Sequence, residues 1–315
     1  AGAAAIAGGS LLLMFRACPG NDWMPSKDGL RQQFLYAVPL GLAALAGTID
    51  RSIDKVMVGA LTTPESFAVY VNGAVEIPLI AVLTGSVAAV LVVEYNRLYR
   101  EDRLVEVVAL IHRAMLKCAL VLIPVMLFLL CVAPELMRLV YGPTYEASAT
   151  PFRIYLFLLP MRTLNFGAIL MATRRSGHVL VQSVITLLAN VILTYYAIAF
   201  FGAIGAAIAS VVVVYLVALP YLLAVLRKVL QCPVHRLFPC RELLKVGVAS
   251  LCGIFGVLVV KWLIAEWPDL FSLMASTMIW CSGTVLFFWA FGLVDPRRTL
   301  SSLYRKYQGK ECEQP

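Results

Sequence analysis

Charged side chains stand inside apolar stretches of this sequence, at spacings that group them on common helix faces. Residues 50–55 read Asp-Arg-Ser-Ile-Asp-Lys. Asp50 and Asp54 are four residues apart and share a helix face, and Arg51, three residues from Asp54, can pair with it. A carboxylate in such a place can take up H⁺ or Na⁺, and a guanidinium can hold an anion by forked hydrogen bonds.

Polar and charged residues also occur inside the later apolar stretches of the chain. They are Asn72 with Glu76, then Arg153, then Arg162 with Asn165, and finally Asn190. Ionisable groups inside a membrane span are costly and need a partner or a water-filled cavity, so each is a candidate functional residue. Several prolines stand among them, with Pro78 just after Glu76 and Pro160 just before Arg162. A proline inside a span removes a backbone hydrogen bond and kinks the helix.

The composition shows what kind of protein holds these residues. The chain has 315 residues, of which 61% are hydrophobic and 14% charged, and its mean hydropathy is +0.86. Soluble domains carry about 25% charged residues. The composition therefore excludes a soluble enzyme, a disordered protein and a secreted disulfide scaffold. The apolar runs are about 20 residues long, which suits membrane-spanning helices rather than barrel strands. We expect an all-α polytopic membrane protein.

The apolar runs define the predicted organisation. They fall near residues 1–15, 33–60, 66–95, 105–132, 151–173, 178–200, 203–226, 244–265 and 270–294. The first run is short and has no basic start, so we interpret it as the end of a truncated helix in a fragment of a longer protein. The predicted segments are this helix end (1–16), a cytoplasmic loop (17–30), a six-helix lobe (31–229), a second cytoplasmic loop (230–242), a two-helix hairpin (243–294) and a cytoplasmic tail (295–315).

The net charge of +8 is distributed as in a membrane protein rather than as in a nucleic-acid-binding one. Lys and Arg gather in every second loop, near residues 16–31, 97–103, 174–175, 227–245 and 297–310. The alternate loops hold only Arg138. Because basic loops stay on the cytoplasmic side, this asymmetry predicts a cytoplasmic C-terminus.

The depth of three charged residues indicates a polar cavity. Counted from the outer helix ends at 1.5 Å per residue, Asp50, Glu76 and Arg162 lie roughly 14–17 Å deep. That is near the middle of a hydrocarbon core about 30 Å thick, where transporters hold their substrates. The candidate substrate-binding residues are Arg162, Arg51, Asp50, Glu76, Asn72 and Asn165, and the candidate ion-coupling residues are Asp50, Asp54 and Glu76. The alternative is that these charges only pair with one another between helices.

Other basic residues have simpler explanations beside functional ones. Arg113 and Lys117 share a face on the inner half of the third span, with His112 nearby. They are candidates for contact with a lipid diphosphate, or they simply extend to the inner headgroups. Lys55 and Lys261 lie nearer the outer surface, and we expect both to extend toward it.

Enzyme motifs in this sequence are weak or missing. The pair Asp50 and Asp54 resembles one half of the magnesium diphosphate motifs of membrane prenyltransferases, but the second half is not found. Cys232, His235 and Cys240 share one loop in a spacing that fits no common zinc site. The sequence has no GxxxxGK[ST] loop. We expect a non-enzymatic protein with no metal and no cofactor other than H⁺ or Na⁺ as a coupling ion.

Two stretches carry a family resemblance. Residues 35–83 contain the run Asp54-Lys55-Val56-Met57-Val58-Gly59, followed by Glu65 and Tyr70. Residues 190–210 read NVILTYYAIAFFGAIGAAIAS, and residues 152–175 are a looser match. The chain thus resembles the C-terminal portion of polysaccharide flippases of the O-antigen and capsule type. They form a family of the multidrug/oligosaccharidyl-lipid/polysaccharide exporter superfamily.

The resemblance implies a fold and a function. The fold would be one six-helix lobe of a two-lobe transporter plus two additional helices. The implied function is the flipping of a lipid-linked oligosaccharide of the undecaprenyl-diphosphate type across the bacterial cytoplasmic membrane by alternating access. The implied partners are the lipid bilayer, this lipid-linked substrate, the missing N-terminal lobe and the polysaccharide polymerase machinery, with no nucleic acid. The alternatives are a cation-coupled drug antiporter, a membrane enzyme acting on polyprenyl-phosphate sugars and a non-transporting scaffold.

Overall fold

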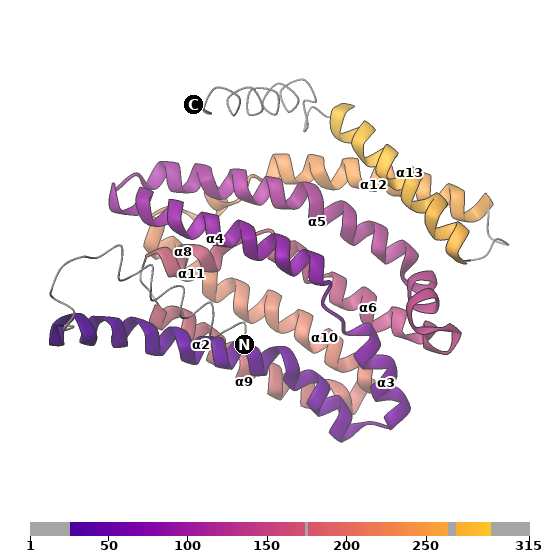
Figure 1. Ribbon diagram of the computed structural model, residues 1–315, viewed down its shortest axis with the longest axis horizontal. Helices are drawn as coiled ribbons and strands as arrows, with labels where there is room; N and C mark the ends of the chain where they lie inside the picture. The colour runs from indigo at the N-terminus through magenta and orange to yellow at the C-terminus, as the bar shows by residue number, and fades with distance from the viewer. Residues whose placement is uncertain (1–25, 174–175, 264–268, 291–315) are drawn as a thin grey trace, which may run out of the picture.

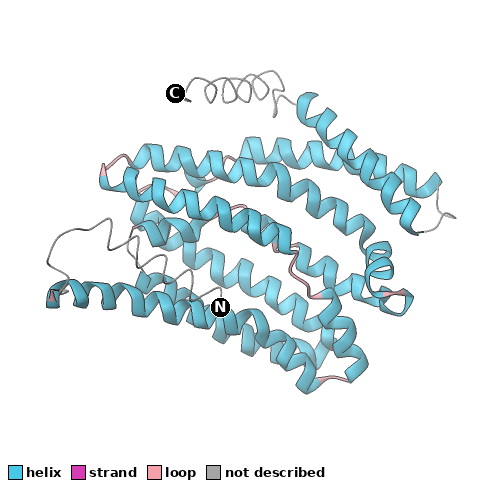
Figure 2. Cartoon of the chain, in the orientation of Figure 1, coloured by secondary structure: helices cyan, strands magenta, loops and turns pink. Residues whose placement is uncertain are grey.

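The computed structural model of the chain describes residues 26–173, 176–263 and 269–290. The predicted segments 1–16 and 295–315 lie outside these ranges. Within the described ranges every regular element is a helix and no strand occurs (Figure 2). The predicted all-α class is therefore confirmed.

The elements follow one another with short connections. The long helices are α2 (Lys27–Leu61), α4 (Pro78–Arg100), α5 (Leu104–Tyr141), α9 (Ser176–Phe201), α12 (Cys240–Leu263) and α13 (Asp269–Ala290). The shorter ones are α3 (Pro64–Gly73), α6 (Ala149–Leu156), α7 (Leu159–Arg162), α8 (Phe166–Ala172), α10 (Ala203–Val213) and α11 (Leu219–Leu230). Two 3₁₀ segments, η1 (Pro143–Ser148) and η3 (Val234–Leu237), and the π-helical η2 (Val214–Ala218) complete the set.

The number of spans agrees with the sequence. Seven helices in the described ranges are long and apolar enough to cross a membrane. An eighth span results if residues 143–162 and 166–172, which are bent by 45°, form one crossing. These eight correspond to the eight full apolar runs expected between residues 33 and 294. The chain is a multi-pass membrane protein.

Local sequence explains where several helices begin. Ser26 caps α2, since its side chain accepts a hydrogen bond from the backbone N–H of Gly29 at 3.1 Å. Thr63 caps α3 in the same way, with Pro64 in the first helical position. Gly202 has a φ of 61°, which a residue without a side chain adopts freely, and it makes the tight turn between α9 and α10.

The helices run alongside one another as an antiparallel bundle (Figure 1). Helix α2 packs against α9, and α4 lies between α5 and α8. The turn between α4 and α5 lies at the same end of the bundle as the start of α2, and the turn between α2 and α3 lies at the opposite end (Figure 1). This alternation is what the distribution of basic loops requires.

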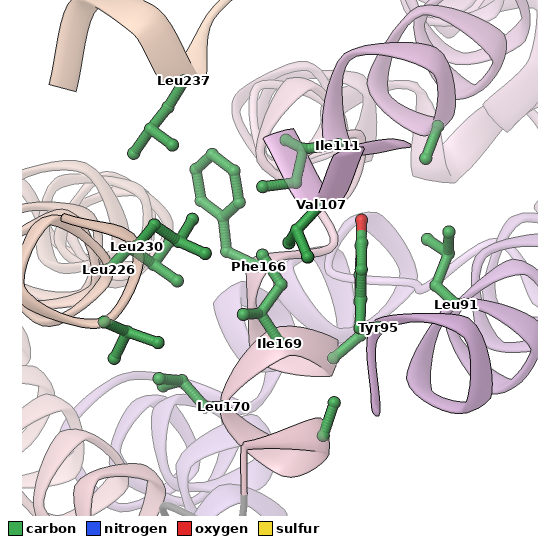
Figure 3. Packing of buried hydrophobic residues seen from close by; sticks show 14 of the residues in the cluster. Leu91, Tyr95, Val107, Ile111, Phe166, Ile169, Leu170, Leu226, Leu230 and Leu237 are labelled. Carbon is green, nitrogen blue, oxygen red and sulfur yellow. The ribbon is translucent and has the colours of Figure 1, made fainter. Parts of the chain in front are cut away.

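An apolar core packs where the end of α4 and the start of α5 meet α8, α11 and η3 (Figure 3). There Tyr95 of α4, Ile111 of α5, Phe166 of α8, Leu226 of α11 and Leu237 of η3 are buried together. These side chains face inward from five elements and hold the ends of the helices at fixed positions. The fixed ends also set the positions of the more polar residues in the middle of the bundle.

The last two helices form a hairpin that docks on α5. Phe128 stacks on Trp280 with ring centroids 4.8 Å apart. Lys261 binds Glu135 at 2.7 Å, and the two side chains are 23% and 14% exposed. The expectation that Lys261 extends to the membrane surface is therefore wrong, because a carboxylate on α5 lies within its reach. At the end of α5, Arg138 also binds Asp269 of α13 at 2.8 Å.

Three spans lose their α-helical geometry at matching places. Residues 74–77 separate α3 from α4, so Glu76 lies outside a helix and the run 66–95 is not one continuous helix as expected. Residues 163–165 separate α7 from α8, with Asn165 at a φ of 46°. The π-helical η2 interrupts the span formed by α10 and α11. Pro78 and Pro220 each stand in the first turn of the helix that follows such an irregularity, and Pro160 stands in the first turn of α7, the short helix that ends at residues 163–165.

Candidate functional site

A cavity of about 510 Å³ opens where these irregular segments meet. Its lining comes from α2, from the residues between α3 and α4 and the first turn of α4, from α6 and α7, and from α9, α10 and η2. Non-helical backbone at membrane depth is tolerated only where it is buried in protein or lines a polar cavity, which accounts for the position of these segments. Discontinuous helices also form the substrate sites of many transporters.

Four of the six predicted substrate-binding residues line this cavity, namely Asp50, Arg51, Glu76 and Arg162. Asp54, predicted for ion coupling, lines it as well. The three residues assigned to one depth thus share one space, although Asp50 is 112 positions from Arg162 in the sequence.

The other two predicted substrate-binding residues lie elsewhere. Asn72 is on α3, outside the cavity lining. Asn165 is the cap residue just before α8, and its amide nitrogen donates to the backbone oxygen of Thr163 at 3.4 Å and to the Cys118 sulfur at 3.5 Å. These contacts hold the backbone turn at the break between α7 and α8, so Asn165 positions the break rather than lining the cavity.

Arg162 and Glu76 form an ion pair across the cavity. The guanidinium of Arg162 donates from Nη2 to Oε1 of Glu76. Arg162 is the last residue of α7, and Glu76 stands between α3 and α4, so the pair joins two interrupted spans. The side chains are 32% and 47% exposed. The pair therefore lies on the surface of the cavity, where water weakens it.

Asp54 is held differently, by two tyrosine hydroxyls. It is 3% exposed, and its Oδ2 accepts hydrogen bonds from Tyr70 of α3, at 2.8 Å, and from Tyr155 of α6. Its Oδ1 accepts the backbone N–H of Lys55 at 2.8 Å. A buried carboxylate with this set of donors is compensated without a cation. The predicted pairing of Arg51 with Asp54 is not among the ion pairs of the described residues.

Asp50 contacts a polar group on α9. The amide nitrogen of Asn190 donates to its Oδ1 at 2.9 Å, and Thr194 donates to the amide oxygen of Asn190 at 3.0 Å. The chain of contacts fixes the orientation of the Asn190 amide and aims its donor at the carboxylate. Asn190 and Thr186 also line the cavity.

Two cations of the cavity have no carboxylate bound to them in the described part of the chain. Arg51 reaches only Thr48, at 3.4 Å, and Lys55 stands in no salt bridge there. Lys55 lines the cavity, whereas its distance from the helix end led us to expect it at the outer surface. The lining thus holds three carboxylates and three basic groups, and Arg51 and Lys55 are the two basic groups that a ligand can reach without displacing a carboxylate from a salt bridge.

The basic pair Arg113 and Lys117 lies on α5, away from this cavity, and both side chains are exposed. Arg113 donates to its own helix, at the backbone oxygen of Ala109. His112 contacts the backbone oxygen of Arg236 at 2.8 Å, which ties η3 to α5. Nothing brings Arg113 or Lys117 to the cavity, so any lipid contact would be on the outer surface of the bundle.

A metal centre is not formed by the part of the chain that the structure describes. No three His, Cys, Asp or Glu side chains there are placed to share an ion, and this includes Cys232, His235 and Cys240. The polar cavity is therefore the candidate site.

Comparisons with known proteins agree with this fold. The family described as polysaccharide biosynthesis protein matches residues 9–150. The structure is similar to that of the lipid II flippase MurJ in an inward closed conformation, with a TM-score of 0.62 and 16% identity over 78% of this chain and 52% of the other. It is also similar to a MOP superfamily transporter from Pyrococcus furiosus, with a TM-score of 0.51 and 15% identity over 79% of this chain and 61% of the other.

The chain thus spans about half the length of the flippase that it matches in structure. No curated protein matches it in sequence. The family match over residues 9–150 agrees with the resemblance to polysaccharide flippases that the sequence indicated, and the two structural similarities show that the chain shares the fold of these transporters.

Proposed function

We propose that this chain forms one lobe of a flippase that moves a lipid-linked oligosaccharide of the undecaprenyl-diphosphate type across the bacterial cytoplasmic membrane. The superfamily fold and the match to a polysaccharide biosynthesis family support a membrane transporter of this kind. The Lys and Arg residues gathered in every second loop, near residues 16–31, 97–103, 174–175, 227–245 and 297–310, favour an orientation with the C-terminus in the cytoplasm.

The observation that carries the proposal is that basic side chains of the cavity wall are open to a ligand. Arg51 and Lys55 line it without a bound carboxylate, and Arg162 stands opposite with a partner that solvent can reach. Guanidinium groups bind phosphate oxygens through two parallel hydrogen bonds. We assign the diphosphate and the first sugar of the substrate to this cavity, while the polyprenyl tail stays in the bilayer.

The carboxylates supply a means of coupling. Asp50 lies beside Arg51, faces the cavity and is bound by a neutral amide, so uptake of H⁺ or Na⁺ would change the charge that a substrate meets. We propose Asp50 as the principal coupling group. Asp54 is nearly inaccessible and is held by two hydroxyls, which favours a structural role, and Glu76 acts through Arg162.

Transport by alternating access requires a second wall facing the cavity. The chain spans about half of the MurJ structure, so we propose that an N-terminal lobe completes the pathway and that polysaccharide polymerase machinery receives the product. With carboxylates and basic groups both lining the cavity, drug and cation antiport is the competing function.

A translocation assay tests the proposal. The full-length protein is reconstituted in liposomes with a fluorescent undecaprenyl-diphosphate oligosaccharide, and the fraction of label reached by an external quencher is followed. We expect transfer between leaflets that falls at least tenfold in Arg51→Gln, since one charge-assisted contact to phosphate is worth about 1.5–3 kcal/mol. Arg241→Gln, which changes an exposed basic residue of α12 outside the cavity lining, is the matched control. Transport of ethidium in place of the lipid would establish the antiporter, and transport of neither would leave a scaffold.

A further inference from the structure

We infer that Glu76 occupies the anion position of Arg162 when no substrate is bound, and that a phosphate of the substrate displaces it, which frees α4 to move. The inference rests on the proposed function, because it requires an anionic substrate. It gives Glu76 two roles: Glu76 sets the affinity of the cavity for an anion, and it couples binding of that anion to movement of α4.

Of the three carboxylates in the cavity, Glu76 is the one placed to be displaced. Asp54 is 3% exposed and accepts hydrogen bonds from two tyrosines. Asp50 accepts one from Asn190. Glu76 lies in a non-helical segment and is 47% exposed, and in the part of the chain that the structure describes its carboxylate is bound by Arg162 alone. A carboxylate and a phosphate oxygen compete for the same guanidinium donors.

The positive charge around Arg162 favours this exchange. The charge of Arg51 acts on Arg162, so the two guanidinium groups repel each other. Glu76 supplies one negative charge to this pair, whereas a diphosphate supplies more than one and adds acceptor oxygens on several sides. A phosphate group therefore satisfies Arg162 and Arg51 together, which the single carboxylate does not.

The position of Glu76 connects the exchange to the backbone. Helix α3 is fixed on one side, because Tyr70 is bound to Asp54 and Gly73 packs so closely that an added Cβ would lie 2.5 Å from Pro151. Helix α4 packs instead against α5 and α8. Residues 74–77 join these two parts, and Ile77 has an extended backbone. The ion pair of Glu76 with Arg162 ties this joint to α7, and its loss leaves the joint free to bend.

Binding of inorganic pyrophosphate to the purified chain in detergent tests the exchange. Calorimetric titration should give a dissociation constant in Glu76→Gln that is roughly two- to fivefold lower than in the unsubstituted chain, as expected for loss of a half-exposed ion-pair partner. Glu76→Asp, which keeps the charge but shortens the reach, should fall between them and serves if the Gln variant does not fold. Glu94→Gln, which removes an exposed carboxylate paired with Arg97 on the same α4, should leave the constant unchanged.

A second readout follows the joint itself. A single cysteine at Val75, which lines the cavity, is placed in a variant without the eight native cysteines, and its alkylation rate is measured with and without pyrophosphate. Pyrophosphate should change this rate when Glu76 is present and should have no effect in the Glu76→Gln background, where the tie is already lost.

The outcomes separate the two claims. Equal pyrophosphate affinity in the Glu76→Gln variant and the unsubstituted chain overturns the exchange while leaving the anion site in place. An alkylation rate at position 75 that responds equally in both backgrounds also overturns it. Absence of pyrophosphate binding in the unsubstituted chain and in Glu76→Gln overturns the anion site of the proposed function, and the exchange with it.

Discussion

Replacing Asp54 by asparagine is the substitution with the most definite expected cost. The carboxylate accepts three hydrogen bonds, two at Oδ2 from tyrosine hydroxyls and one at Oδ1 from the backbone N–H of Lys55. It accepts at both oxygens and donates at neither. An asparagine of the same shape has one oxygen and one NH₂ group, so one of its ends presents a donor to another donor.

The cost follows from the geometry. With the amide oxygen in the Oδ2 position, the new NH₂ faces the Lys55 N–H, and with the opposite flip it faces both tyrosine hydroxyls. Either orientation leaves at least one buried donor without an acceptor, which costs about 1–3 kcal/mol. Since Asp54 is 3% exposed, water cannot replace the lost acceptor. We therefore expect Asp54→Asn to lower the free energy of unfolding by that amount.

Unfolding of the purified chain in mixed micelles of sodium dodecyl sulfate and a nonionic detergent, followed by circular dichroism, measures this difference. Asp102→Asn is the matched control, since Asp102 is exposed in a turn with a φ of 56°, a conformation that asparagine adopts readily. The control should stay within about 0.5 kcal/mol of the unsubstituted chain. Equal stability of Asp54→Asn and Asp102→Asn would refute the argument that Asp54 is a buried acceptor of three hydrogen bonds.

Two further stability predictions concern helix packing. Gly205→Ala should destabilise the chain by about 1–3 kcal/mol, because the added Cβ would lie 2.1 Å from the backbone oxygen of Ala197 and must push α10 away from α9. In Gly247→Ala, in α12, the added Cβ would meet nothing within 4 Å, so this substitution should instead stabilise the helix by up to about 1 kcal/mol. If the micelle assay shows that both substitutions change the free energy of unfolding in the same direction, the described packing of α10 on α9 is wrong. Glu135→Gln should cost about 1–3 kcal/mol by leaving the ammonium of Lys261 without its carboxylate, and unchanged stability would mean that this ion pair does not hold the hairpin.

The sequence predicted the spans because each apolar run is long enough to cross a membrane by itself. It also carried a local signal for the breaks, since Pro78, Pro160 and Pro220 stand where regular helix resumes. The common depth of Asp50 and Arg162 followed from counting residues along helices of known rise, and both residues line the cavity.

Contacts between distant parts of the chain were not predictable in the same way. Lys261 meets a carboxylate 126 positions earlier, and no local pattern indicates that α12 packs on α5 at that height. Lys55 was assigned to the membrane surface by its distance from the helix end, but the cavity reaches it from the side. Tyr155, one of the two donors to Asp54, lies in a run of apolar residues and carried no signal of its own.

Thiol labelling tests most directly whether the cavity holds water and binds the anionic end of the substrate. Single cysteines replace Leu158, Met161 or Val214, uncharged residues of the cavity wall, and Phe255, an exposed residue of α12 that we expect to face lipid. In membranes containing the cysteine-free full-length protein with one of these substitutions, labelling by a small membrane-impermeant thiol reagent is measured. We expect labelling at the three cavity positions that is blocked by undecaprenyl-diphosphate oligosaccharide, and no labelling at position 255. No labelling at the cavity positions, or labelling that the lipid does not block, would contradict this expectation.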